Sequence, residues 1–324
     1  MIDLAFLTSE LSATALIGLL DEFKLVITIF EYLALLFTAH RMLPPVPLGE
    51  KIKWGWASLK PTLKFSLTIA FTSIVWVCVT QMDKMVLSGI LPLSEYGYFT
   101  LAVLVAGGIL VVSGPVGAAL MPRMANLEAQ GKHAELILLY RQSTQLVAVV
   151  AGAITTTVAL GSETILLAWT GDAIISNQAA PILTLYAWGN GMLALAAFPY
   201  YLQYAKGDLR LHLIGNAIFI VLLIPAIVIA ATRYQGIGAG YVWLTINLIS
   251  FVAWLPLVHR KFEPGLNAKW YFHDILKIIA PVVFTGTLLF QFISFTSNRW
   301  IDIAILGLIG LLLLLTGCMG SSDI

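Results

Sequence analysis

QMDKMVLSGILPLSEYGYFT, residues 81–100, joins two long hydrophobic segments and places an adjacent acid and base, Asp83 and Lys84, at the end of the first. An ionisable group within or just inside a bilayer is costly, so it indicates either a functional site or an anchor at the membrane surface. Pro92 ends the first segment, because proline cannot continue a helix without losing a hydrogen bond. This stretch therefore predicts a turn between two membrane-spanning helices that carries candidate functional charges.

The composition of the whole chain indicates a membrane protein. The 324 residues are 59% hydrophobic and 11% charged, whereas soluble domains are typically about 45–50% apolar and 25% charged. The net charge of +1 gives no basic excess that would attract nucleic acid. Cys78 and Cys318 lie far apart in apolar sequence and predict no disulfide framework. We expect an all-α, polytopic membrane protein with no nucleic-acid partner.

Long apolar runs give the number of predicted spans. A helix needs about 20 apolar residues to cross the hydrocarbon core of a bilayer. Nine runs meet this requirement, at residues 24–42, 65–91, 97–121, 143–169, 180–204, 211–231, 236–258, 274–295 and 300–318. A weaker run at 4–20 is either a tenth span or a surface segment, so we expect nine to ten transmembrane helices.

The basic residues are divided unevenly between the two sides of the membrane. If the loop after 24–42 is cytoplasmic, 14 of the 18 lysines and arginines fall on the cytoplasmic side. The other side receives only Lys24, Lys84, Arg233 and Arg299. Because cytoplasmic loops carry an excess of lysine and arginine, this pattern predicts a cytoplasmic C-terminus.

The helix that carries Asp83 is predicted to have one polar face. At about 100° per residue, one arc of its surface holds Thr68, Thr72, Ser73, Trp76, Thr80 and Asp83. Either this face lines a transport path, with Trp76 and Thr80 as site residues, or its hydroxyls bond to backbone and neighbouring helices as ordinary packing. Lys84 has an alternative role as an interfacial anchor, whereas the Asp83 carboxylate pairs poorly with its neighbour and needs another partner.

Three other kinds of residue inside the predicted spans are informative, namely two acids, three prolines and a group of aromatic residues. Glu31 and Glu163 are candidates for a proton or substrate pathway, although each could instead be protonated and bonded to a neighbouring group. Pro115, Pro199 and Pro225 are expected to kink or interrupt their helices. The span at 180–204 is rich in aromatic residues that could stack on sugar rings or could simply pack; they are Tyr186, Trp188, Phe198, Tyr200, Tyr201 and Tyr204.

Motifs of enzymes and of metal sites are missing from the sequence. It contains neither a GxxxxGK[ST] phosphate-binding loop nor an HExxH zinc motif. The five histidines are scattered without the spacing of metal ligands. We therefore expect no catalytic residue, no metal and no cofactor, and a protein that is not an enzyme.

Four blocks of the sequence, taken together, resemble a known family. They are QMDKMVLSGILPLSEYGYFTLA at 81–102, SGPVGAALMPRMANLEAQGK at 113–132, LLYRQSTQLV at 138–147 and ILLAWTGD at 165–172. In this order they are similar to the second half of the bacterial polysaccharide (O-antigen) flippases, the Wzx-type proteins of the MATE-like superfamily. The similarity extends from about residue 24 onward.

The resemblance implies a transport function. Such flippases have two lobes of about six helices around a polar, charged cavity that opens alternately to either face. They move an oligosaccharide linked to undecaprenyl pyrophosphate from the cytoplasmic to the periplasmic leaflet of the inner membrane, for O-antigen, capsule or exopolysaccharide synthesis. The implied partners are this lipid-linked oligosaccharide, membrane lipid, a polysaccharide polymerase and a chain-length regulator. Alternatives are another MATE-like exporter, of drugs or of the peptidoglycan lipid precursor, and a membrane glycosyltransferase or polymerase.

Only a few residues and boundaries carry over from the family. Asp83 and Lys84 match its QxDK segment, and Arg123 matches its proline-arginine pair, although Arg123 also suits a positive cytoplasmic loop. The predicted domains are a remnant of the first lobe with a cytoplasmic linker at 1–64, a six-helix MATE-like C-terminal lobe at 65–258, and two additional helices with a tail at 259–324. Family members carry about six helices before 65–91, so we expect this chain to be truncated.

Overall fold

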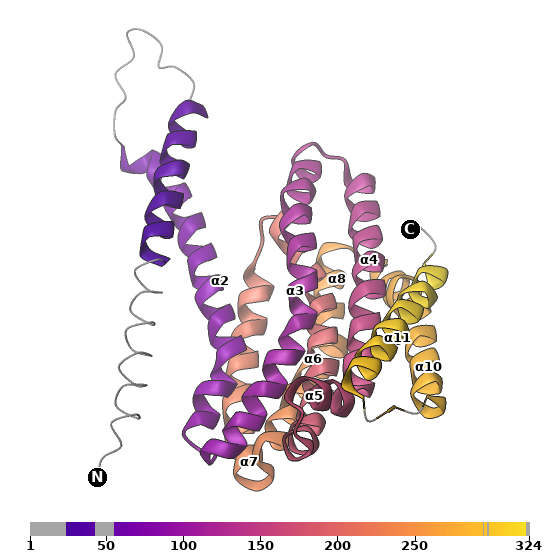
Figure 1. Ribbon diagram of the computed structural model, residues 1–324. Coiled ribbons are helices and arrows are strands. Elements are labelled where there is room, and N and C mark those ends of the chain that lie inside the picture. The colour runs from indigo at the N-terminus through magenta and orange to yellow at the C-terminus, as the bar shows by residue number, and fades with distance from the viewer. Residues whose placement is uncertain (1–23, 43–54, 294, 297, 322–324) are drawn as a thin grey trace, which may run out of the picture. The chain divides into compact units, whose positions relative to one another are not determined.

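Helices make up nearly all of the chain that the structure describes (Figure 1). The structure, a computed structural model, describes residues 24–42, 55–293, 295–296 and 298–321. The chain divides into two units, Met1–Leu63 and Lys64–Ile324, and each is considered by itself. The first unit contains the helix Lys24–Met42, which carries Glu31. The weak run at 4–20 lies outside the described residues.

The second unit contains a bundle of long helices and their short connections. The elements are α2 (Trp56–Ser88, which starts in the first unit), α3 (Leu93–Ala129), α4 (His133–Leu160), α5 (Ser162–Thr170), α6 (Ala173–Ala205), α7 (Arg210–Ile249), η1 (Ser250–Trp254), α8 (Leu255–Phe262), α9 (Leu266–Lys269), η2 (Trp270–Leu276), α10 (Lys277–Phe292) and α11 (Arg299–Gly320). The described residues contain no strand and form eight helices that are long and apolar enough to cross a membrane. The predicted all-α, polytopic membrane fold is confirmed.

One of these eight helical stretches contains a reversal. Arg210–Phe262 has 53 residues, and a straight helix of that length would extend about 80 Å, far more than the roughly 30 Å of a bilayer core. Gln235 breaks it with φ 54° and ψ −142°. After the break the chain returns, because a Cβ atom placed on Gly215 would lie 2.6 Å from Nε1 of Trp254. The stretch therefore supplies both predicted spans, 211–231 and 236–258.

An ion pair joins the two ends of this hairpin outside the spanning segments. Lys261 Nζ donates a hydrogen bond to Asp208 Oδ2 at 2.7 Å, and the backbone amide of Arg210 donates to Asp208 Oδ1 at 3.1 Å. These two donors hold the pKa of the Asp208 carboxyl below its usual range. The contact fixes the turn after α6 to the end of α8.

The prolines behave differently from the expectation. Pro115, Pro199 and Pro225 lie inside α3, α6 and α7, and these helices continue through them. The prolines therefore do not interrupt their helices, and the other expectation, that they kink them, stays a prediction. Proline removes the N–H donor for the carbonyl four residues earlier, and membrane helices tolerate this loss where neighbouring groups or local adjustments compensate for it.

α6 lies at the centre of the bundle and packs against α3, α4, α5 and α7 (Figure 1). Small residues allow the close approach, as is common between membrane helices. A Cβ atom on Gly189 would lie 2.5 Å from the indole ring of Trp243, and one on Gly191 would lie 2.6 Å from the hydroxyl of Thr155. Glycine is therefore required at both contacts.

Polar contacts connect the C-terminal helices to α4. Asp274, in η2, is fully buried and accepts two hydrogen bonds from the Arg141 guanidinium at 2.8 Å each and a third from Gln145 Nε2 at 2.9 Å. Tyr140 is hydrogen-bonded to His259 at 2.8 Å in the same region. The domain boundary at 258/259 stays a prediction, and these contacts cross it.

We predict that Gln235→Gly raises the free energy of unfolding by up to about 1 kcal/mol, because glycine adopts a positive φ without the steric cost that glutamine has. Gln235→Val should lower it by about 1–2 kcal/mol, because a β-branched side chain suits this conformation least. Thermal unfolding of the purified protein in detergent micelles measures both. The matched control is Gln178→Gly on the exposed side of α6, which should lower stability by about 1 kcal/mol. Equal losses in both glycine variants would show that Gln235 is unstrained.

Candidate functional site

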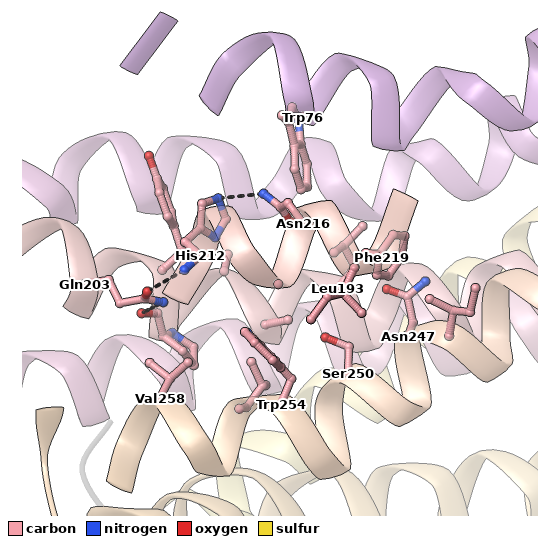
Figure 2. Close-up of a pocket in the computed structure, with 18 of the residues that line it drawn as sticks. Trp76, Leu193, Gln203, His212, Asn216, Phe219, Asn247, Ser250, Trp254 and Val258 are labelled. Atoms are coloured by element: carbon pink, nitrogen blue, oxygen red, sulfur yellow. Dashed lines mark hydrogen bonds between the residues drawn. The ribbon is translucent and has the colours of Figure 1, made fainter. Parts of the chain in front are cut away.

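A cavity of about 580 Å³ lies within the second unit, between α2, α6 and the hairpin formed by α7, η1 and α8. Figure 2 shows side chains from all of these elements around it. The hairpin contributes two walls, because its outgoing part carries His212 and Phe219 and its returning part carries Asn247 and Trp254. The reversal at Gln235 is therefore what closes this side of the cavity.

The lining of the cavity is apolar and aromatic, with a few neutral polar groups. None of the described residues that line it is aspartate, glutamate, lysine or arginine. The neutral polar side chains are Thr72, Ser73, Gln203, Asn216, Asn247 and Ser250, and His212 is the one imidazole. This lining differs from the charged cavity that the family resemblance implies.

His212 lies at one end of the cavity, with Asn216 and Gln203 beside it, whereas Asn247 and Ser250 lie toward the other end (Figure 2). Asn216 Nδ2 donates a hydrogen bond to His212 Nε2 at 3.0 Å, and the backbone amide of His212 donates to Gln203 Oε1 at 2.8 Å. Since Nε2 accepts, a neutral His212 ring carries its proton on Nδ1. Tyr200 lies against the same ring, with 4.4 Å between the ring centroids.

Aromatic side chains line the cavity from four elements, one of which is α7 with Phe219. Trp76 on α2 is 41% exposed, Trp254 lies on η1, and Tyr200 and Tyr201 lie on α6. The aromatic-rich sequence of 180–204 thus contributes part of the cavity wall. Flat, partly exposed rings beside amide groups can stack on a ring and hydrogen-bond its substituents at the same time.

The predicted polar face of α2 divides into two parts. Thr72, Ser73 and Trp76 line the cavity, whereas Thr80 and Asp83 do not. The Thr80 hydroxyl donates to the carbonyl of Trp76 at 3.0 Å, which is the ordinary packing role that the sequence left open. Among the described side chains of this face, Thr72, Ser73 and Trp76 alone border the cavity.

Asp83 has a specific partner that the sequence did not identify. The carboxylate is 1% exposed and accepts hydrogen bonds from the Tyr186 hydroxyl at 2.8 Å and from the backbone amide of Lys84 at 2.7 Å. The Lys84 ammonium group donates instead to Gln81 Oε1 at 2.9 Å. Asp83 thus links α2 to α6, and its neighbour Lys84 points to a different group.

Tyr186 connects this carboxylate to a buried polar chain. Its ring stacks on Trp243 with 5.5 Å between the centroids and 10° between the planes. Trp243 Nε1 donates to Asn190 Oδ1 at 3.0 Å, and Asn190 Nδ2 donates to the carbonyl of Ala106 at 2.9 Å. The chain joins α2, α6, α7 and α3. The sequence identified Tyr186 only as one of several aromatic residues. The further sequence signal for this polar chain was an asparagine, Asn190, inside an apolar span.

The remaining predicted site residues are not brought to the cavity. Glu163 is exposed in the first turn of α5. Arg123 is exposed near the C-terminal end of α3. Asp83 lies near the α2–α3 turn, at the opposite end of that helix. Glu31 belongs to the helix Lys24–Met42 of the first unit. Roles for these three residues stay predictions.

Residues 23–174 match the model of a family described as polysaccharide biosynthesis protein. The predicted resemblance to this family is confirmed. The structure is also similar to that of the lipid II flippase MurJ in an inward closed conformation, with a TM-score of 0.60 and 16% sequence identity. The match covers 84% of this chain and 56% of the flippase, and at this identity it shows a shared fold. No curated protein matches the chain.

We predict that Tyr186→Phe lowers the free energy of unfolding by about 1–3 kcal/mol, because the buried Asp83 carboxylate loses a hydrogen-bond donor. In an Asp83→Leu background the same change should cost close to nothing, because the tyrosine hydroxyl then has no carboxylate to bond. Thermal unfolding of the four proteins of this cycle measures the coupling. Tyr241→Phe, at an exposed position of α7, is the control and should be neutral. A Tyr186→Phe cost that is the same in both backgrounds would show that the two side chains are not coupled.

Proposed function

We propose that this chain is part of a flippase that moves a lipid-linked oligosaccharide, carried on undecaprenyl pyrophosphate, from the cytoplasmic to the periplasmic leaflet of the bacterial inner membrane. The product would serve O-antigen, capsule or exopolysaccharide synthesis, with a polymerase and a chain-length regulator as partners. The observation that carries the proposal is the cavity with aromatic and neutral polar walls in a chain similar to polysaccharide biosynthesis proteins. The chain spans 56% of the flippase it resembles, so a second lobe is needed to complete the transport path.

The cavity suits the oligosaccharide better than it suits the pyrophosphate. Sugar rings present C–H faces that stack on aromatic rings such as Trp76 and Tyr200, and hydroxyl groups that bond to neutral polar side chains such as Asn216 and Ser250. A pyrophosphate would need cations, and the cavity wall offers none among its described residues.

The pyrophosphate therefore belongs at the end of the bundle that we assign to the cytoplasm. Arg210 and Arg260 are exposed there, at the two ends of the α7–α8 hairpin. Exposed cations near a cavity mouth raise the local concentration of an anionic substrate. In this arrangement the lipid-linked substrate enters with its sugar in the cavity and its phosphates at the rim.

Asp83 is proposed to act on the position of α2. It lies seven residues beyond Trp76 on the same helix, about 10 Å along the axis, and its bond to Tyr186 holds α2 against α6. Breaking this bond would free the helix that forms one cavity wall. Lys84, Glu31, Glu163 and Arg123 stay candidates for coupling to an ion or for contact with the substrate.

A second candidate substrate is the peptidoglycan lipid precursor. The structural similarity to a lipid II flippase favours it. That precursor is also a sugar carried on a lipid pyrophosphate, so the same cavity and rim would accept it. The identity of the lipid-linked intermediate that accumulates on inactivation separates the two candidates.

We expect Asp83→Asn, made in the full-length gene at its own locus, to abolish surface polysaccharide and to cause accumulation of the lipid-linked oligosaccharide. Trp76→Ala should reduce surface polysaccharide by about 2- to 10-fold, the effect expected from losing one stacking contact. Trp56→Ala is the matched control, because Trp56 is an exposed tryptophan on the same helix and outside the cavity.

Quantitative extraction of lipid-linked intermediates, with immunoblotting of the protein, measures these effects. Unchanged polysaccharide in both the Asp83→Asn and the Trp76→Ala variant, at normal protein level, would refute the proposed function. Accumulation of the peptidoglycan precursor in place of the oligosaccharide would favour the second candidate.

A further inference from the structure

A second cavity lies on the side of the bundle, away from the one described above. It has a volume of about 530 Å³ and lies between α5 and the N-terminal half of α11, which pack against each other (Figure 1). α5 contributes Ile165 and Trp169, and α11 contributes Arg299, Trp300, Ile303 and Leu306. The two segments are more than a hundred residues apart in the sequence, so only the fold brings them together.

This groove combines an apolar floor with a rim that suits a membrane surface. Leu306 is 7% exposed and forms part of the floor, whereas Trp169 and Trp300 are 58% and 71% exposed at the rim. Tryptophan rings favour the headgroup region of a bilayer, where one part of the ring is apolar and the N–H is wet. The groove therefore changes from apolar to polar along its length, as a phospholipid does.

Arg299 gives the rim a positive charge that no carboxylate in the described part of the chain neutralises. Its guanidinium lies 5.7 Å from the centre of the Trp300 ring, and it makes no ion pair with any described residue. Of the nearby acids, Asp172 uses its carboxylate to cap α6, and Asp302 is buried and accepts from Thr296. An unpaired guanidinium beside an apolar slot selects for an anion with an apolar part.

We propose that this groove is a binding site for one anionic phospholipid of the surrounding bilayer. The Arg299 guanidinium would bind the phosphate, the two tryptophans would flank the headgroup, and one acyl chain would lie along Ile165, Ile303 and Leu306. The apolar floor argues for a lipid over free phosphate. The site is separate from the sugar cavity, so the proposal does not depend on the proposed transport function.

Tryptophan quenching tests this proposal directly, because Trp169 and Trp300 are at the rim. The purified full chain in detergent micelles is titrated with phosphatidylglycerol or phosphatidylcholine whose acyl chains are brominated. We expect phosphatidylglycerol to quench at lower concentration than phosphatidylcholine. Arg299→Gln should weaken the apparent affinity for phosphatidylglycerol by about fivefold, as expected for one basic group at an anionic surface, and leave that for phosphatidylcholine unchanged.

The matched control is Arg233→Gln, because Arg233 is an exposed arginine near the reversal of α7 and lies outside the groove. It should retain the wild-type preference, and size-exclusion chromatography checks that both variants fold. Three results would overturn the proposal: equal quenching of the wild type by both lipids, a preference that survives Arg299→Gln, or an equal loss in Arg233→Gln. Relief of quenching by inorganic phosphate at millimolar concentration would overturn it as well, because the site would then bind the phosphate group alone.

Discussion

A polar group buried among the helices is stabilised only by partners inside the protein, because the core of a bilayer offers no water to bond it. Asp274 meets this requirement through Arg141 and Gln145, and Asp83 meets it through Tyr186. Each contact joins helices that are far apart in the sequence. A charged or polar residue in such a fold therefore fixes a particular pair of helices, whereas apolar packing alone permits several arrangements.

The cavity depends on the same requirement for backbone groups, which must also be hydrogen-bonded within the protein. The chain reverses between two apolar spans, where a short connection leaves few backbone groups unpaired, and Gln235 makes that connection with a positive φ. The reversal brings Trp254 against Gly215, so one continuous segment forms two of the walls. Glycines at the contacts with α6 then let the helices approach closely without filling the cavity.

The sequence predicted the fold class and most of the spans because hydrophobic length is a local property. The predicted span 143–169 was wrong at its end, because α4 stops at Leu160 and Ser162–Thr170 form the separate short helix α5. The sequence separated 211–231 from 236–258 correctly although the helical stretch is nearly continuous there. The helical arc placed Trp76 correctly, and the weak pairing of Asp83 with Lys84 correctly required another partner for the carboxylate. The identity of that partner, Tyr186, could not be predicted, because it lies 103 residues away and depends on how α6 rotates against α2. The helical arc that groups these residues on one face of α2 also could not show that Thr80 lies outside the cavity.

The neutral lining of the cavity has a consequence for selectivity, if the chain carries lipid-linked sugars as proposed. Pyrophosphate is common to all such substrates, so cations in the cavity would bind every one of them equally and would not distinguish among them. Aromatic rings and neutral polar groups respond instead to the orientation of hydroxyl groups, because a buried polar group left without a hydrogen bond costs about 1–3 kcal/mol. A sugar whose hydroxyls find no partner in the cavity would be rejected by this penalty on its own hydroxyls. The separation of an uncharged cavity from a charged rim thus lets one part of the protein attract the substrate class and another part discriminate within it.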